Sequence, residues 1–306
     1  MSIQLSKPLL RYTLAGLLAI ILWSLASVVT RGSSEQIGAV LAGAIIYLSG
    51  GIAGLCLHPT ATYHMLASVS WRVAVILFFY VTDVLAFTLC IGLALTQRSA
   101  VDVTLINYLW PALTVIFTIV VFKQPTNSKV WLALMMALSG LMIALDPEIS
   151  GFSDRMAASP AVYALGVWAA VSWALYCVFS RKYADHIKGN MSAVAFICVG
   201  SVLAAAYLAQ PSATLPAVEH LWLPTCLGVG LIIAYTAWDY AIRLGNYKLI
   251  VNLSFFIPIL STVLYWPVFD IVPTATFWIG VALLCVGSRW MYQQSEQLAR
   301  PPDSNC

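Results

Sequence analysis

Long apolar runs, each close to the length that crosses a lipid bilayer, follow one another along almost the whole chain. A bilayer core about 30 Å thick requires about 20 predominantly apolar residues of helix. Ten runs approach that length, and short polar or Gly- and Pro-containing links separate most of them: Tyr12–Thr30, Ile37–Leu57, Val73–Leu95, Ser99–Phe122, Val130–Leu145, Ala161–Ser180, Met191–Ala209, Leu221–Leu244, Leu249–Phe269 and Val272–Ser288. The pattern predicts an all-α membrane protein with ten transmembrane helices and no second soluble domain.

The composition excludes the usual soluble classes. Of the 306 residues, 61% are hydrophobic and only 9% are charged, whereas an ordinary soluble domain carries about 25% charged residues. So few charges cannot cover a soluble globule of this length. We therefore exclude a soluble enzyme, a disordered chain and a nucleic-acid binder, and we expect the lipid bilayer as a partner. The seven cysteines are read as small membrane hydrophobes rather than as a disulfide framework.

The basic residues gather on one side of the predicted membrane. Twelve of the 15 Lys and Arg residues lie in the N-terminus, the even-numbered links and the tail. The opposite side carries the other three, Arg31, Arg98 and Arg155. Cytoplasmic loops of membrane proteins carry the excess of Lys and Arg. Both termini are therefore expected in the cytoplasm.

The two halves of the chain match each other at near-constant offsets. A shift of 150 residues places Trp23 on Trp173, and a shift of 147 places Pro111 on Pro258. Each half holds five predicted spans, an odd number, so the halves must cross the membrane in opposite directions. The expected units are a first five-helix repeat, a second, inverted five-helix repeat and a polar cytoplasmic tail, at residues 1–150, 151–293 and 294–306. Inverted repeats are typical of secondary transporters, whose substrate site lies near the midplane; a duplication without a transport role is the alternative.

Several short segments carry a family resemblance. The segments Leu22-Trp23-Ser24, Trp173-Ala174-Leu175-Tyr176 and Trp238-Asp239-Tyr240-Ala241, within the duplicated plan, resemble the EamA-like members of the drug/metabolite transporter superfamily. Asn107-Tyr108-Leu109-Trp110-Pro111, with Asp102 before it and Tyr47-Leu48-Ser49-Gly50 in the second span, is similar to the YddG-type aromatic amino acid exporters of that superfamily. The resemblance implies export of Phe, Tyr and Trp, and of related aromatic compounds, across a bacterial inner membrane by alternating access.

Two prolines lie inside predicted spans. Pro111 and Pro258 each remove a backbone donor and clash with the preceding turn, which frees the carbonyls of Asn107 and Ser254. In lipid such a carbonyl must face protein, water or a ligand. A pair of kinks related by the repeat predicts hinges at the midplane. The alternative is that Ser, Thr or water satisfies each freed carbonyl.

Candidate substrate-binding residues are the polar and aromatic side chains deep in the spans: Tyr80, Asp83, Asn107, Tyr108, Trp110, Trp168, Trp173, Tyr176 and Trp238. Asp83 is the deepest ionisable group, and an ionised Asp at that depth costs about 3 kcal/mol on insertion scales. It is read either as an anchor for a substrate ammonium or a proton carrier, or as a carboxyl group satisfied by neighbouring hydroxyls. A midspan Trp can stack on a substrate ring, although each of these rings could equally serve packing alone.

Two acid–base pairs favour a structural interpretation. Asp239 and Arg243 are four residues apart, which places them on one helix face in the favourable order, so an internal ion pair is expected. Arg98 and Asp102 have the same spacing at the outer surface, where Asp102 could also lie at a cavity mouth.

No motif for catalysis, a cofactor or a metal stands out. The four histidines lie in links or at span ends, and no P-loop or nucleophile elbow occurs, so we expect neither an enzyme nor a cofactor. The alternatives to aromatic amino acid export are transport of another small solute, such as other amino acids, purines or cationic drugs, and a membrane subunit that transports nothing. The energy coupling and the oligomeric state stay open, and a monomer is compatible with the sequence.

Overall fold

The computed structural model is an assembly of helices. It describes residues 7–94, 97–145, 150–211, 213–214, 216–269 and 273–298, without the side chains of residues 27–35, 97 and 265–269. Within those ranges there is no strand. The side chain of Arg31 and residues 299–306 of the predicted tail lie outside the described part.

The helices follow one another through short connections. In chain order they are α1 (Lys7–Ile37), α2 (Ala39–Leu57), α3 (Pro59–Ala67), α4 (Trp71–Leu93), α5 (Gln97–Asn107), α6 (Trp110–Val121), α7 (Ser128–Leu145), α8 (Phe152–Ala158), α9 (Pro160–Lys182), η1 (Ala184–His186), α10 (Ser192–Leu208), η2 (Val218–His220), α11 (Trp222–Leu244), α12 (Tyr247–Ser254), α13 (Ile257–Phe269) and α14 (Ala275–Leu298).

Several of these helices are long and apolar enough to lie across a bilayer. Seven helical segments of the described chain meet that requirement, one of which joins α5 to α6, and the bent pair α12–α13 makes an eighth. The helix α10 is apolar but has only 17 residues. The polytopic membrane class is confirmed, and the count of ten spans stays a prediction.

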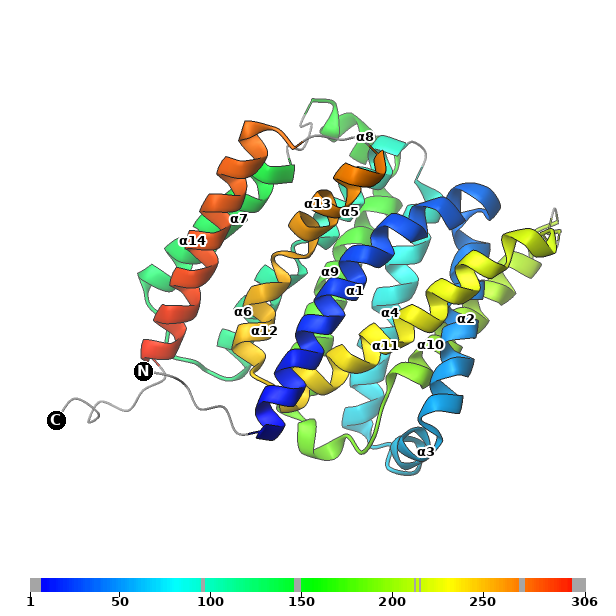
Figure 1. Ribbon diagram of the computed structural model, residues 1–306, viewed down its shortest axis with the longest axis horizontal. Coiled ribbons are helices and arrows are strands. Elements are labelled where there is room, and N and C mark those ends of the chain that lie inside the picture. The colour runs from blue at the N-terminus through cyan, green and yellow to red at the C-terminus, as the bar shows by residue number, and fades with distance from the viewer. Residues whose placement is uncertain are drawn as a thin grey trace.

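Helices from the two halves of the chain pack against each other. The most extensive contacts are those of α7 with α14, α2 with α10, α1 with α11 and α4 with α9. Figure 1 shows α1, in blue, crossing α11, in yellow, and α14 running beside α7. The helix α1 begins at the same end of the bundle at which α14 ends. The chain therefore enters and leaves the helical bundle at one end.

Small residues allow the close helix approaches. A Cβ atom on Gly140 of α7 would lie 2.7 Å from the Gly280 oxygen of α14 and would also meet the backbone nitrogen of Leu284. A Cβ on Gly50 of α2 would lie 2.5 Å from the Gly228 oxygen of α11. Without a hydrophobic driving force between helices in lipid, such backbone contacts supply much of the packing energy. Gly50 therefore allows close packing of α2 against α11.

The predicted fourth and ninth spans are interrupted just before their prolines. The helix α5 ends at Asn107, and Pro111 lies in the first turn of α6, where its missing N–H breaks no helical hydrogen bond. The helix α12 meets α13, with Pro258 as its second residue, at a bend of 45°. Ser24 of α1 donates a hydrogen bond of 3.3 Å to the Ile257 carbonyl at this bend.

The chain departs from the prediction at its ends and in its links. The helix α14 continues to Leu298, whereas the sequence pattern ended the last span at 288 and began the tail at 294. Lys248 holds the extension, because its Nζ donates to the Ser295 carbonyl at 3.1 Å and pairs with Glu296 at 3.3 Å. Two short helices, α3 and α8, occupy links that the sequence predicted only as connections. The six described cysteines are free thiols.

Candidate functional site

Seven aromatic side chains meet at the centre of the bundle. We call them the central aromatic cluster: Trp23 of α1, Tyr80 of α4, Trp110 of α6, Trp173 and Tyr176 of α9, and Tyr235 and Trp238 of α11. Trp173 is the hub, with ring centroids 4.8 Å from Tyr176, 5.6 Å from Tyr80 and Tyr235, 5.7 Å from Trp23 and 6.2 Å from Trp110. Trp238 closes the group, 5.0 Å from Trp23 and 5.5 Å from Trp110.

Local helix geometry presents these rings to one another. Trp173 and Tyr176 are three residues apart, as are Tyr235 and Trp238, so each pair lies on one helix face. Trp110 is the first residue of α6, directly after the interruption of the fourth span. The residue directly after the break therefore contributes its indole ring to the cluster.

Several polar atoms in the cluster are buried without a protein partner. The indole N–H groups of Trp23 and Trp238 and the hydroxyl of Tyr80 make no well-formed hydrogen bond within the described part of the chain, although Ser192 lies near Tyr80 and Cys177 near Trp238. Buried Trp and Tyr donors usually find an acceptor. These three donors are therefore free to receive an acceptor that comes from a bound solute.

Asp83 lies in the middle of α4, one turn after Tyr80. The residue is only 6% exposed, and the structure gives its carboxyl group neither a hydrogen bond nor an ion pair with another described residue. An unpaired buried carboxyl group is costly unless it is protonated or meets a cation. Asp83 therefore keeps both predicted functional interpretations, an anchor for an ammonium group and a proton carrier.

A buried ion pair borders the cluster on α11. The Arg243 Nη2 donates to the Asp239 carboxylate at 2.6 Å, and neither side chain is more than 3% exposed. The Tyr176 hydroxyl donates to the other carboxylate oxygen at 3.1 Å. This network confirms the predicted internal ion pair and attaches one ring of the cluster to it.

The same arginine ties α11 to the link between α9 and α10. Its guanidinium donates to the carbonyls of Ile187 at 3.2 Å and of Gly189 at 2.8 Å. Asn190 Nδ2 donates to the Thr236 hydroxyl at 2.9 Å. Arg243 thus neutralises Asp239 and also holds the link that follows α9 against α11.

A second acid–base–tyrosine group lies at the opposite end of α9. Arg155 of α8 binds the Asp102 carboxylate through Nε at 2.7 Å and Nη2 at 3.2 Å, and the Tyr163 hydroxyl donates to the same carboxylate at 2.7 Å. The hydrogen bond to Asp102 raises the pKa of the Arg155 guanidinium above its ordinary value. The structural interpretation of Asp102 is confirmed, with Arg155 as a partner that the spacing of Arg98 and Asp102 did not indicate.

Five of the nine predicted binding residues belong to the central aromatic cluster: Tyr80, Trp110, Trp173, Tyr176 and Trp238. Asp83 lies beside it on α4. The Asn107 side-chain oxygen is buried without a partner among the described residues, and Tyr108 packs against the second apolar core, between α7, α13 and α14.

Trp168 lies apart from the cluster. It is 39% exposed and contacts Phe78 and Phe79 at the outside of α4. The predictions missed Trp23 and Tyr235. The match of Trp23 with Trp173 in the repeat, and the place of Tyr235 three residues before Trp238, are the signals that point to them.

Apolar spans that enclose buried acids and aromatic rings define a polytopic membrane protein, and acids inside the membrane commonly mark solute or ion pathways in this class. The chain belongs to the EamA-like transporter family, which it matches over residues 10–145 and again over 161–293.

Two relatives carry the same description. The aromatic amino acid exporter YddG of Salmonella typhimurium is 33% identical over 90% of this chain and 94% of its own. The exporter of that name from Escherichia coli is 32% identical over the same shares. One solved structure superposes with a TM-score of 0.76 over 94% of this chain and 99% of its own, at 22% identity, and shows that the fold is shared.

Proposed function

We propose that this chain exports aromatic amino acids from the cytoplasm across a bacterial inner membrane, by alternating access between two inverted five-helix repeats. The central aromatic cluster carries the proposal. It combines seven rings, three hydrogen-bond donors without partners and a buried acid one turn away. The names of the two relatives support the aromatic substrate class.

The cluster is complementary to a zwitterion with an aromatic ring. A substrate ring can replace one of the protein's own ring contacts, each worth about 0.5–1.5 kcal/mol beyond area burial. The carboxylate can accept from the indole N–H groups of Trp23 and Trp238. The ammonium group can pair with Asp83, which lacks a cation among the described residues.

The pairing of helices supports the inverted repeat. In the two repeats, α1 corresponds to α9, α4 to α11 and α6 to α13. If the repeats have equivalent contacts, the contact of α1 with α11 should have a counterpart between α9 and α4. The contact of α1 with α13 becomes that of α9 with α6 in the same way, and all four contacts are present. The family match also falls into two segments, one in each half. Two halves with equivalent contacts can rock about a shared centre.

The rings touch one another in this conformation, so a substrate enters only when the helices that carry them separate. Trp110 follows the interruption of the fourth span, and Pro258 lies at the bend of the ninth. Bending at these two positions would move α6 and α13 relative to α9 and α1, which they contact. We therefore keep Pro111 and Pro258 as hinges in the proposal.

Counterflow in proteoliposomes tests the substrate class. Vesicles loaded with unlabelled Phe, Tyr or Trp are expected to take up labelled Phe transiently, whereas vesicles loaded with Ala or Asp are not. Preferential counterflow with a purine or a cationic drug would replace the proposed substrate. Absence of counterflow with every solute, from protein that remains folded, would contradict transport itself.

Replacement of one ring in the cluster tests the site. Trp110→Ala removes an indole that touches Trp173 and Trp238, so Phe and Trp should compete about tenfold more weakly in counterflow, the equivalent of one ring contact. The matched control is Trp168→Ala, because Trp168 is an indole outside the cluster. Equal loss in both variants would contradict a stacking role at the centre.

A further inference from the structure

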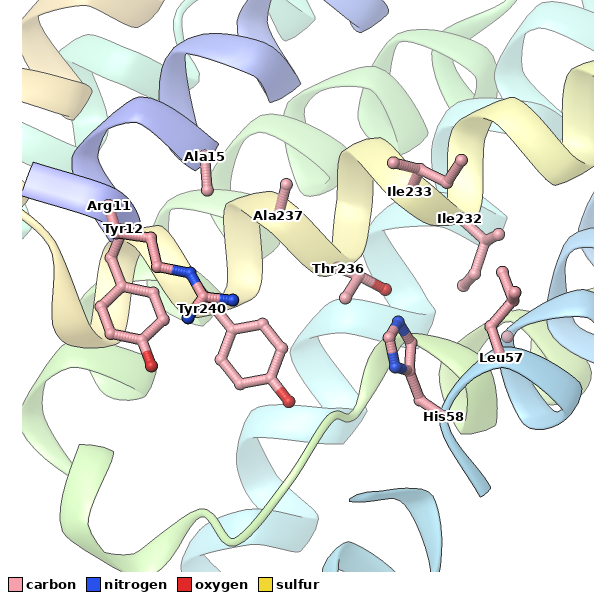
Figure 2. Close-up of a pocket in the computed structure, with 11 residues that line it drawn as sticks. Arg11, Tyr12, Ala15, Leu57, His58, Ile232, Ile233, Thr236, Ala237 and Tyr240 are labelled. Atoms are coloured by element: carbon pink, nitrogen blue, oxygen red, sulfur yellow. The ribbon is translucent and has the colours of Figure 1, made fainter. Parts of the chain in front are cut away.

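A groove of about 270 Å³ lies between α1, α2 and α11. Figure 2 shows His58 and Thr236 near Leu57 and Ile232, so the groove also has polar side chains away from Arg11. Arg11, Tyr12 and Tyr240 lie at one end, and Ile232 and Ile233 lie at the other. This polar end coincides with the beginning of α1, which the pattern of basic residues predicts at the cytoplasmic surface of the bilayer.

The groove opens away from the central aromatic cluster. Ile233, Ala237 and Tyr240 share one face of α11 at spacings of four and three, whereas Tyr235 and Trp238 of the cluster lie on the opposite face. The Ile233 side chain is 46% exposed. The body of α11 therefore separates the groove from the solute site, and its open side faces the surrounding lipid.

The polar end carries positive charge that the described protein does not balance. Arg11 is exposed and makes no hydrogen bond or ion pair with a described residue. Lys7 lies four residues earlier, on the same face of α1, and the first turn of α1 has no acidic residue. The start of a helix adds a partial positive charge.

The neighbouring tyrosines are held in place. The Tyr12 and Tyr240 rings stack with centroids 6.2 Å apart, and the Arg243 guanidinium lies 5.0 Å from the Tyr240 centroid. The mouth of the groove therefore offers a free guanidinium beside two fixed phenol rings.

We propose that this groove binds an anionic phospholipid, with the phosphate beside Arg11 and Lys7 and one acyl chain along Ile233 and Ala237. Basic pockets between transmembrane helices bind anionic lipid headgroups. A soluble anion would leave the exposed apolar half uncovered, and a zwitterionic lipid would leave the two cations unbalanced. The occupant that matches both halves is an amphiphile with a net negative headgroup.

Native mass spectrometry of the purified protein tests the headgroup. We use phosphatidylglycerol and phosphatidylcholine with identical acyl chains, and expect the wild type to retain the first more tightly. Lys7→Gln with Arg11→Gln should weaken phosphatidylglycerol binding about thirtyfold, or about 2 kcal/mol at about 1 kcal/mol per basic residue and 1.4 kcal/mol per tenfold. Phosphatidylcholine binding should not change.

The matched control is Lys123→Gln with Lys129→Gln, which removes the same charge before and within α7. This control should retain phosphatidylglycerol like the wild type. Equal weakening in both double variants, or equal binding of both lipids by the wild type, would overturn a specific anionic site.

The apolar half has its own test. Ala237→Phe places a ring in the groove and should reduce retention of either lipid, while the protein keeps its elution volume in size-exclusion chromatography. Unchanged retention of phosphatidylglycerol in Ala237→Phe would overturn the position of the acyl chain. Counterflow of Phe in phosphatidylcholine vesicles should be the same for the wild type and Lys7→Gln with Arg11→Gln, which separates this inference from the proposed transport function.

Discussion

At the scale of single residues, Asp83 is the side chain whose replacement separates the two functional interpretations. As a proton carrier, Asp83→Asn should abolish the dependence of efflux on a pH gradient and spare downhill exchange. As an anchor for the substrate ammonium, it should weaken exchange itself at every pH. Flux of labelled Phe from proteoliposomes, with and without a pH gradient, distinguishes these outcomes.

The control for this experiment is Asp154→Asn, which removes an exposed carboxylate in α8. Identical flux from wild type and Asp83→Asn under both conditions would leave Asp83 with a purely structural role. Wild-type flux that never responds to a pH gradient would make the protein a facilitator.

Asp239 gives the second prediction at this scale. Asp239→Ala leaves the Arg243 guanidinium buried without its carboxylate, and breaking a buried pair from one side costs about 3–5 kcal/mol. We expect a clear fall in the thermal unfolding midpoint in detergent. Replacing both partners, as Asp239→Asn with Arg243→Gln, should recover part of the loss because no charge stays buried alone. A midpoint equal to that of the wild type in Asp239→Ala would contradict the network around Arg243.

At the scale of helices, the contact of α7 with α14 depends on glycine. Gly140→Ala would press a methyl group against backbone atoms of Gly280 and Leu284, and overpacking of this kind typically costs about 1–3 kcal/mol. The matched control is Gly230→Ala in α11, where nothing lies within 4 Å of the added carbon. Thermal unfolding should separate the two variants, and equal midpoints would show that the helices can move apart at no cost.

Two tyrosines of α9 donate hydrogen bonds to buried carboxylates of other helices, one toward each end of α9. Tyr163 binds Asp102 near one end, and Tyr176 binds Asp239 nearer the other. Tyr163→Phe should loosen only the first end, where Cys90 packs beside Tyr163. The parent for this experiment is a variant in which Cys90 is the only cysteine. A membrane-impermeant maleimide should label Cys90 faster when Tyr163→Phe is added to this parent, and at the parent's rate when Tyr176→Phe is added. Equal labelling of all three would contradict a separable opening at this end.

The lengths of the apolar runs and the positions of the prolines predicted helices and breaks in them. They did not predict which face of each helix packs in the interior of the bundle. Trp168 and Trp173 are five residues apart, about 140° around the helix, and are 39% and 5% exposed. Lipid chains are as apolar as Leu, so hydropathy does not distinguish the lipid-facing side from the interior. The clustering of Trp23 and Tyr235 likewise depends on contacts between distant segments. The partner Arg155 of Asp102 escaped prediction because 53 residues separate them.

At the scale of the whole molecule, the expected orientation can be measured. α1 begins at the same end of the bundle where α14 ends, and twelve of the 15 basic residues fall on the predicted cytoplasmic side. Alkaline phosphatase fused after residue 298 should be inactive, because the enzyme folds only outside the cytoplasm, and the same reporter inserted at Gly151 should be active. The reverse pattern, or activity at both positions, would contradict ten spans with cytoplasmic termini.

The rings of the central aromatic cluster contact one another in this conformation. Trp23, Tyr80, Trp110 and their neighbours pack against one another in the middle of the bundle, so under the proposed function the unloaded protein can close on its own rings. A carrier that seals while empty can reset after it releases its cargo, and it needs no returning solute to hold it shut. Under the proposed function, a centre that closes on its own rings permits net export and does not require the obligatory exchange of one solute for another.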